Sequence, residues 1–181
     1  VDIAQAALDK GMATIDKSLE RLLSKDKISA ADKQAALGRI TTSPSYEAFA
    51  ACDLVIEAAT ENHGLKIKIL QQVEAVLPEQ VILASNTSTL DVNAIAAFTQ
   101  RPQDVVGLHF FSPANVMKLL EVVRGAKTGK DVMATVMAIG KKIKILQRNY
   151  VAQGSARGPS PELVVNPTLV VLDGTKRTKA K

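Results

Sequence analysis

Three side chains with complementary chemistry lie in one stretch of the sequence: a serine, a histidine and a glutamate. Ser88 lies 21 residues before His109, and Glu121 lies 12 residues after it. A hydroxyl, an imidazole and a carboxylate are the parts of a positioned general base: the imidazole takes a proton, the carboxylate fixes its tautomer, and the hydroxyl orients a substrate oxygen. Histidine suits this role because its usual pKa of about 6.5 lies near working pH.

Each of these residues also has a purely structural interpretation. His109 stands among apolar and aromatic residues, and a histidine in such surroundings is more often a satisfied core residue than a catalyst. Ser88 can be the N-cap of a helix that begins near Leu90, and Glu121 can be a surface charge. The spacing of the three residues does not decide between these interpretations.

Alternating strand-like and helix-like segments must position these side chains. Short apolar runs rich in branched residues predict buried strands, and three- and four-residue apolar spacing predicts helices. The predicted strands are 53–58, 81–84, 105–110 and 118–124, and the predicted helices are 64–77, 91–98 and 129–142. This order is typical of an α/β fold with an open, mostly parallel sheet. Such sheets bind ligands at the carboxyl ends of their strands, where Glu61, residues 85–88 and His109 follow the first three strands.

The N-terminal quarter of the chain predicts two helices. Residues 3–24 have amphipathic helical spacing. Ser29 followed three residues later by Asp32 is the pattern of a capping box for a short second helix, which Gly38 would end.

The C-terminal part has a different character. Residues 147–161 are polar and rich in glycine and proline, which predicts a loop, whereas 163–165 and 168–172 are candidate strands. The last six residues carry four basic groups and no acid, so the net charge of +5 falls to +1 (5 − 4) without them. We therefore expect a domain over 1–146, a divergent, loop-rich or disordered basic tail over 147–181, and no nucleic-acid partner.

Composition excludes several other classes of protein. Apolar residues make up 46% of the chain, which is typical of a globular domain with a real core. The single cysteine, Cys52, rules out an intrachain disulfide. The apolar runs are far shorter than a membrane span, and no cluster of residues has the spacing of a metal site.

Three local motifs carry a resemblance to a known family. They are Val55-Ile-Glu-Ala58 followed by Glu61-Asn62, Ala84-Ser-Asn-Thr-Ser-Thr-Leu90, and Gly107-Leu-His-Phe-Phe-Ser-Pro113 leading into Met117-Lys-Leu-Leu-Glu-Val-Val-Arg-Gly125. Through them the chain resembles the 3-hydroxyacyl-CoA dehydrogenase family, including the dehydrogenase part of multifunctional β-oxidation enzymes, from Val1 to about Ile145.

The resemblance implies a role for each residue of the trio. His109 would be the catalytic base, which removes the proton of the substrate 3-hydroxyl as C3 gives a hydride to the nicotinamide. Glu121 would pair with His109, and Ser88 would hydrogen-bond the reacting oxygen.

The resemblance also implies NAD as cofactor and a set of residues around it. Glu61 and Lys66 match family positions near the nicotinamide ribose and the site entrance. Asn86 and Ser88 match the loop between cofactor and substrate. Asp2 matches the acid that hydrogen-bonds the adenosine ribose.

The implied activity is oxidation of (S)-3-hydroxyacyl-CoA to 3-oxoacyl-CoA with NAD in fatty-acid β-oxidation. The implied partners are an acyl-CoA substrate and either a second copy, as a homodimer, or a multifunctional complex. The compartment would be the cytoplasm in a bacterium and the mitochondrion or peroxisome in a eukaryote. A related β-hydroxyacid dehydrogenase that uses a lysine as acid and base is disfavoured by the His–Glu pair.

One expected feature is missing from the sequence. The family's cofactor domain opens with a strand and a G-x-G-x-x-G turn that presents backbone amides to the pyrophosphate, and no such motif occurs here. We therefore expect an incomplete Rossmann-like sheet, truncated at both ends, with an exposed sheet edge. The alternative function is an inactive scaffold or interaction remnant of the family.

Overall fold

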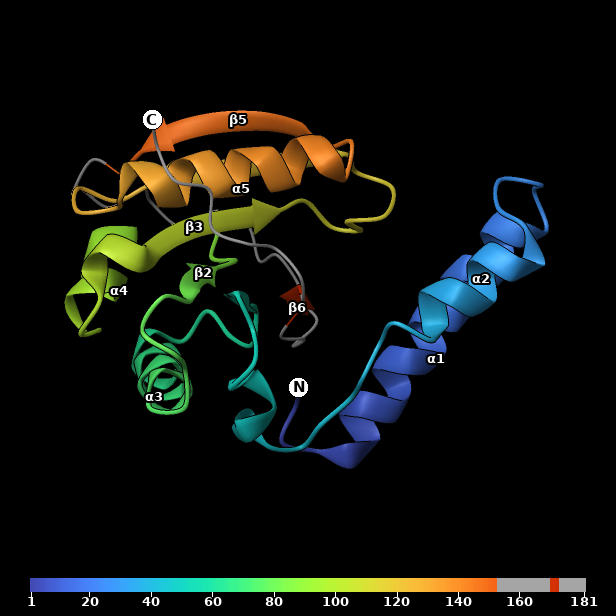
Figure 1. Cartoon of the computed structure of the whole chain (residues 1–181), viewed down its shortest axis with the longest axis horizontal. Coiled ribbons are helices and arrows are strands. Elements are labelled where there is room, and N and C mark those ends of the chain that lie inside the picture. The colour runs from blue at the N-terminus through green and yellow to red at the C-terminus, as the bar shows by residue number, and fades with distance from the viewer. Residues whose placement is uncertain (153–169, 173–181) are drawn as a thin grey trace. The chain divides into compact units, whose positions relative to one another are not determined.

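The computed structural model describes residues 1–152 and 170–172. The chain forms two compact units, Val1–Ala48 and Phe49–Lys181, and the second contains the sheet (Figure 1). Among the helices of the described residues, none combines the length and the hydropathy that crossing a membrane requires.

The first unit is a pair of helices. They are α1 (Gln5–Leu23) and α2 (Ala30–Leu37). The predicted capping box is present, because the Ser29 hydroxyl accepts from the Asp32 amide and the Asp32 carboxylate accepts from the Ser29 amide. Lys33 joins the two helices through ion pairs of 2.8 Å to Asp16 and 2.6 Å to Glu20. Both helices predicted for this region are confirmed.

The second unit is built on a six-stranded sheet with the order β5-β4-β3-β2-β1-β6. Its strands are β1 (Leu54–Glu57), β2 (Ile82–Ser85), β3 (Val105–Phe110), β4 (Leu119–Arg124), β5 (Leu146–Val151) and β6 (Val170–Leu172). The pairs β1–β2, β2–β3 and β4–β5 are parallel, whereas β3–β4 and β1–β6 are antiparallel. The predicted α/β class with a mostly parallel sheet is confirmed.

Helices connect the strands of this sheet. They are the α-helices α3 (His63–Glu74), α4 (Val92–Ala97) and α5 (Lys130–Lys142) and the short 3-10 helix η2 (Pro102–Asp104). A second 3-10 helix, η1 (Tyr46–Phe49), precedes β1. β1 and β2 are buried at every residue, as expected for strands covered on both faces. On one face the strands pack against Val132, Val136 and Ile139 of α5, which lies beside β3 and β5 in Figure 1. This packing fixes the strand ends that carry the polar residues.

β5 corrects the prediction of a loop from residue 147. The strand pairs in parallel with β4 along its whole length, so residues 147–151 belong to the sheet and the domain extends past the expected boundary at 146. The polar pattern misled because β5 is an edge strand: backbone pairing holds it while its side chains stay exposed or half-buried. Gln147 adds a side-chain bond of 2.8 Å from Nε2 to the Met137 carbonyl.

β6 occupies the opposite edge of the sheet. It runs antiparallel to β1, with Leu54 opposite Leu172 and Ile56 opposite Val170. The strand predicted at 168–172 is thus confirmed for 170–172, and the edge of β1 is paired where we expected an exposed edge. The strand predicted at 163–165 lies outside the described residues, as does the part of the predicted loop beyond residue 152.

Candidate functional site

The carboxyl ends of β1, β2 and β3 bring polar side chains to one edge of the sheet. The three strands are parallel neighbours, so the segments that follow them start side by side. β4 returns antiparallel to β3 and places His109 directly opposite Glu121. The sequence predicted this edge as the ligand site, and the structure gathers most of the predicted residues there.

His109 and Glu121 form a hydrogen bond across two strands. The distance from His109 Nδ1 to Glu121 Oε2 is 2.9 Å, and the side chains are 8% and 21% exposed. An ionised carboxylate only accepts hydrogen bonds, so this contact assigns the proton of a neutral imidazole to Nδ1. Nε2 then carries the lone pair.

Nε2 of His109 is the second notable feature of the pair. It is buried and has no hydrogen-bond partner among the described residues. The Phe111 ring lies beside the imidazole, with centroids 5.0 Å apart. A buried acceptor without a partner costs free energy, and a substrate hydroxyl is a group that would satisfy it. Among the described residues, His109 is thus a buried histidine with one of its two ring nitrogens paired.

Ser88 contacts Glu61 in this structure. Its amide donates to Glu61 Oε1 at 2.9 Å and its hydroxyl donates to the same oxygen at 3.2 Å, while Thr87 Oγ1 donates to Oε2 at 2.7 Å. Glu61 therefore joins the segment after β1 to the segment after β2. The helix that follows is capped by Asp91, so the interpretation of Ser88 as an N-cap is wrong.

Asn86 ties three strand ends together. Its backbone N–H donates to the backbone carbonyl of Glu57 at 2.8 Å, and its side-chain oxygen accepts from the backbone N–H of Phe110 at 2.7 Å. Phe110 directly follows His109, so Asn86 links the end of β1 to the strand segment that carries the imidazole.

Lys66 lies inside the domain, paired with a residue that sequence analysis did not select. Its ammonium donates to Glu57 Oε2, and the two side chains are 1% and 0% exposed. The Ser85 hydroxyl donates to the same oxygen at 3.0 Å, and the Ala59 amide donates to Oε1 at 2.8 Å. A signal for Glu57 was available, because a carboxylate inside a buried strand requires a partner.

Asp2 belongs to the first unit. Its carboxylate accepts from the Ala4 amide at 3.0 Å, and its own amide donates to the Ser43 carbonyl at 3.3 Å. These bonds hold the chain just before α1. The structure therefore gathers Glu61, Asn86, Ser88, His109 and Glu121 in the second unit, and Asp2 is described only within the first.

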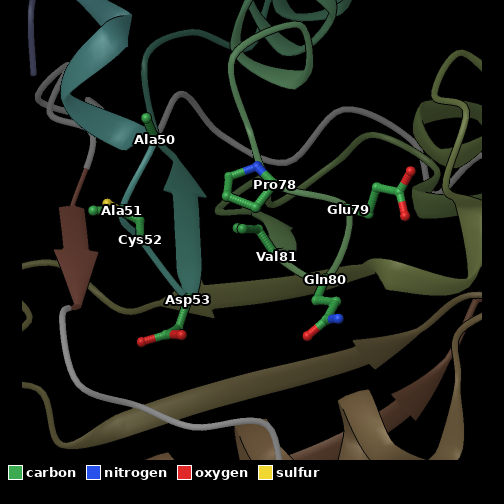
Figure 2. Close-up of a pocket in the computed structure, with 8 residues that line it drawn as sticks. All are labelled: Ala50, Ala51, Cys52, Asp53, Pro78, Glu79, Gln80 and Val81. Carbon is green, nitrogen blue, oxygen red and sulfur yellow. The ribbon is translucent and has the colours of Figure 1, made fainter.

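A cavity of about 500 Å³ lies at the other ends of the strands (Figure 2). It is lined by Ala50, Ala51, Cys52, Asp53, Pro78, Glu79, Gln80 and Val81. These residues precede β1 and β2 and so lie at the amino ends of these strands, whereas His109 lies at the carboxyl end of β3. Across the described residues, no group of three or more His, Cys, Asp and Glu side chains is placed to hold a metal ion.

Comparison with known proteins assigns the family. The family profile for the NAD-binding domain of 3-hydroxyacyl-CoA dehydrogenase matches residues 1–148. The chain belongs to this family. 3-Hydroxybutyryl-CoA dehydrogenase from Clostridioides difficile is 36% identical over 166 residues, which cover 92% of this chain and 57% of that protein.

Two further relatives are similar to this chain over most of its length. The fatty acid oxidation complex subunit alpha of Pseudomonas syringae pv. syringae is 41% identical over 142 residues, covering 78% of this chain and 20% of that protein. The crystal structure of (S)-3-hydroxybutyryl-CoA dehydrogenase from Ralstonia eutropha has a TM-score of 0.83 and 44% identity, covering 86% of this chain and 55% of that one. The chain thus spans between about a fifth and just over half of these relatives' lengths.

The strand-end residues fit one half of the cofactor of this family, NAD. Glu61 places a carboxylate at these strand ends, where its oxygens accept from Ser88 and Thr87, and carboxylate oxygens are acceptors that also suit ribose hydroxyls. The 181 residues contain no G-x-G-x-x-G turn for the pyrophosphate. The fit is therefore to the nicotinamide end of the dinucleotide.

Proposed function

We propose that this chain carries the catalytic residues of an NAD-dependent 3-hydroxyacyl-CoA dehydrogenase, which oxidises (S)-3-hydroxyacyl-CoA to 3-oxoacyl-CoA in fatty-acid β-oxidation. One observation carries the proposal: His109 is held by Glu121 through Nδ1 at 2.9 Å, and its Nε2 is buried and unpaired among the described residues. An imidazole fixed in this way can act as a general base, because Nε2 can accept a proton from a substrate hydroxyl.

His109 and Glu121 divide the work of proton transfer. The substrate 3-hydroxyl gives its proton to Nε2 of His109, the hydrogen on C3 leaves with its electron pair, and the C3–O bond becomes a carbonyl. NAD supplies the hydride acceptor when it is bound. The imidazole becomes a cation in this step, and the Glu121 carboxylate stabilises that charge across the strand pair.

The remaining site residues position substrate and cofactor in this proposal. The Ser88 hydroxyl, which now donates to Glu61, hydrogen-bonds the reacting oxygen after rotation about its Cα–Cβ bond. Glu61 and Asn86 are assigned to the nicotinamide side of the cofactor and Asp2 to the adenosine ribose, whereas Lys66 is buried against Glu57 and supports this side of the site from within the domain. The acyl-CoA substrate, a homodimer or multifunctional complex, and a cytoplasmic location in a bacterium complete the proposal.

A second candidate function is a scaffold that has lost catalysis. The 181 residues contain no G-x-G-x-x-G turn, whose backbone amides normally bind the pyrophosphate. We expect the isolated chain to bind NAD weakly and to turn over little. Micromolar NAD affinity by isothermal titration would contradict this expectation.

A chimera separates the two candidates. Residues 53–148 of this chain replace the corresponding segment of the Clostridioides difficile relative, which then supplies the rest of the enzyme. We expect oxidation of NADH with acetoacetyl-CoA, and a loss of about 10²–10⁴-fold in turnover after His109→Gln. A folded chimera, verified by circular dichroism and gel filtration, that is inactive or indifferent to His109→Gln would reject the dehydrogenase proposal.

A further inference from the structure

Glu57 is a buried carboxylate whose two oxygens accept from three different parts of the domain. Oε1 accepts from the Ala59 amide at 2.8 Å, just after β1. Oε2 accepts from the Ser85 hydroxyl at 3.0 Å, at the end of β2, and from the Lys66 ammonium in the first half of α3. One side chain therefore holds the start of the β1 loop, the end of β2 and α3 together.

Lys66 supplies the positive charge of this arrangement. Glu57 is 0% exposed and Lys66 is 1% exposed. A buried carboxylate is strongly destabilised without a cation, because neither water nor a distant charge compensates for its lost hydration. Removal of the ammonium would therefore leave an uncompensated charge in the interior, and relief of that charge disturbs the bonds to Ala59 and Ser85.

The parts held by Glu57 are the ones that carry the candidate site. Glu57 and Ser85 are opposite each other in the β1–β2 register. Four residues after Glu57, Glu61 accepts from the Ser88 amide and hydroxyl, three residues after Ser85. Two carboxylates from in or just after β1 thus bond to residues in or just after β2. Buried Glu57 bonds to Ser85, and Glu61 in the candidate site bonds to Ser88.

We propose that Lys66 is a positioning residue: through Glu57 it holds the segments after β1 and β2 at the separation at which Glu61 binds Ser88. This inference rests on the proposed function for its effect on the cofactor. It changes the role that the family resemblance implies for Lys66, because the ammonium acts through a buried carboxylate and does not itself touch the nicotinamide ribose.

The test uses the full 181-residue chain and a double-mutant cycle. The variants are Lys66→Met, Glu57→Gln and the double variant Glu57→Gln/Lys66→Met, with Lys68→Met as matched control. Lys68 lies on the same helix and is exposed, so its replacement removes the same charge without touching Glu57. The two readouts are hydrogen exchange of the Ser88 amide and NADH binding, both followed by NMR.

Lys66→Met is expected to speed exchange at Ser88 by about tenfold or more and to weaken NADH binding by about tenfold. Adding Glu57→Gln removes the unpaired charge, and the amide can still accept from Ala59 and bond Ser85, so both readouts should recover most of the loss. Lys68→Met should match wild type. If Lys66→Met alone does not fold, recovery of folding in the double variant supports the same conclusion.

Two results would overturn the inference. Unchanged Ser88 exchange in folded Lys66→Met would show that the pair does not position this loop. Restored exchange without restored NADH binding in the double variant would show that Lys66 contacts the cofactor itself. NADH binding too weak to measure in wild type, with the exchange pattern as expected, would leave the positioning role supported. The proposed function would then be judged by the chimera, whose inactivity would count against it.

Discussion

Two pairs of a carboxylate and a basic side chain, Glu121–His109 and Glu57–Lys66, differ in what each leaves unpaired. In the β3–β4 region, Glu121 bonds one nitrogen of His109, and the other nitrogen is buried without a partner among the described residues. In the β1–β2 region, both oxygens of Glu57 are occupied, and Lys66 lies against one of them.

This difference distinguishes a pair that can act on a ligand, His109–Glu121, from a pair that holds the fold, Lys66–Glu57. A buried acceptor left open is costly in the free protein and is tolerated where a ligand completes it. A buried carboxylate whose two oxygens both accept hydrogen bonds has little to offer a ligand, and it serves to hold the backbone segments that it joins. Residue type alone does not distinguish the two pairs, since each contains one carboxylate and one basic group.

Glu121→Gln should have the largest effect on turnover, because it removes the carboxylate charge beside His109 while keeping the shape of the side chain. The amide can donate to Nδ1 of His109, which favours the wrong tautomer and leaves no charge to stabilise the imidazolium. We expect turnover of the chimera to fall by about 10³–10⁴-fold, by analogy with catalytic triads.

Acetoacetyl-CoA-dependent NADH oxidation measures this loss. Glu79→Gln is the matched control, since Glu79 lines the cavity at the opposite strand ends and its replacement should leave the rate unchanged. A loss of less than about tenfold for Glu121→Gln would mean that the carboxylate does not set the state of His109.

Gly107→Ala tests the strand pairing that brings His109 to Glu121. A Cβ at Gly107 would lie 2.8 Å from Val123 Cβ and 3.0 Å from Val92 Cγ2, so β3 must shift against β4 or α4. We expect a loss of about 1–3 kcal/mol in the free energy of unfolding, measured by urea titration. Gly11→Ala is the control, because nothing lies within 4 Å of its Cβ position, and inside α1 it should stabilise by about 0.5–1 kcal/mol.

Asn86→Ala tests the connection between the two regions. The substitution removes the oxygen that accepts from the Phe110 amide at 2.7 Å, and a buried donor left without a partner costs about 1–3 kcal/mol. Asn86→Asp keeps an acceptor at the same place and should lose less. Equal stability of the alanine variant and wild type in urea unfolding would show that β3 does not depend on this bond.

Sequence patterns predicted most of the fold because its central strands are unambiguous. Residues 54–57, 82–85 and 105–110 are short runs dominated by branched apolar side chains, which only a buried strand accommodates in this order. β5 was missed since an edge strand depends on backbone pairing with β4, and its exposed side chains keep a loop-like polarity. Tertiary pairing decided this element.

The site was predicted in part, for a related reason. The family resemblance implied the His109–Glu121 pair, and the antiparallel register of β3 and β4 places the two residues opposite each other. The partner of Ser88 did not follow, because Glu61 and Ser88 meet only after the parallel pairing of β1 and β2 brings their loops together. Glu57 lies inside a predicted strand, where the apolar pattern gives it no role, although a buried charge there requires a partner such as Lys66.

Asp32 in the capping box of α2 is an acid at the surface, in contrast to buried Glu57 and half-buried Glu121. Changes to its hydrogen bonds should have the smallest effect on the protein. Hydrogen bonds from the Ser29 hydroxyl and amide lower the pKa of Asp32 below its usual value of 3.8. A lowered pKa means that the ionised form favours the folded helix, so its contribution is complete above pH 3.8 and is lost as pH falls through the lower folded value. NMR titration of Asp32 and of the α2 amides between pH 6 and pH 2 measures this, and Ser29→Ala should raise the Asp32 pKa and weaken α2 at neutral pH.

An unchanged Asp32 titration in Ser29→Ala would show that the capping box does not cause the lowered pKa of Asp32. Because water solvates Asp32 freely, the change should remain confined to α2, unlike the loss of Lys66 from the sealed pair.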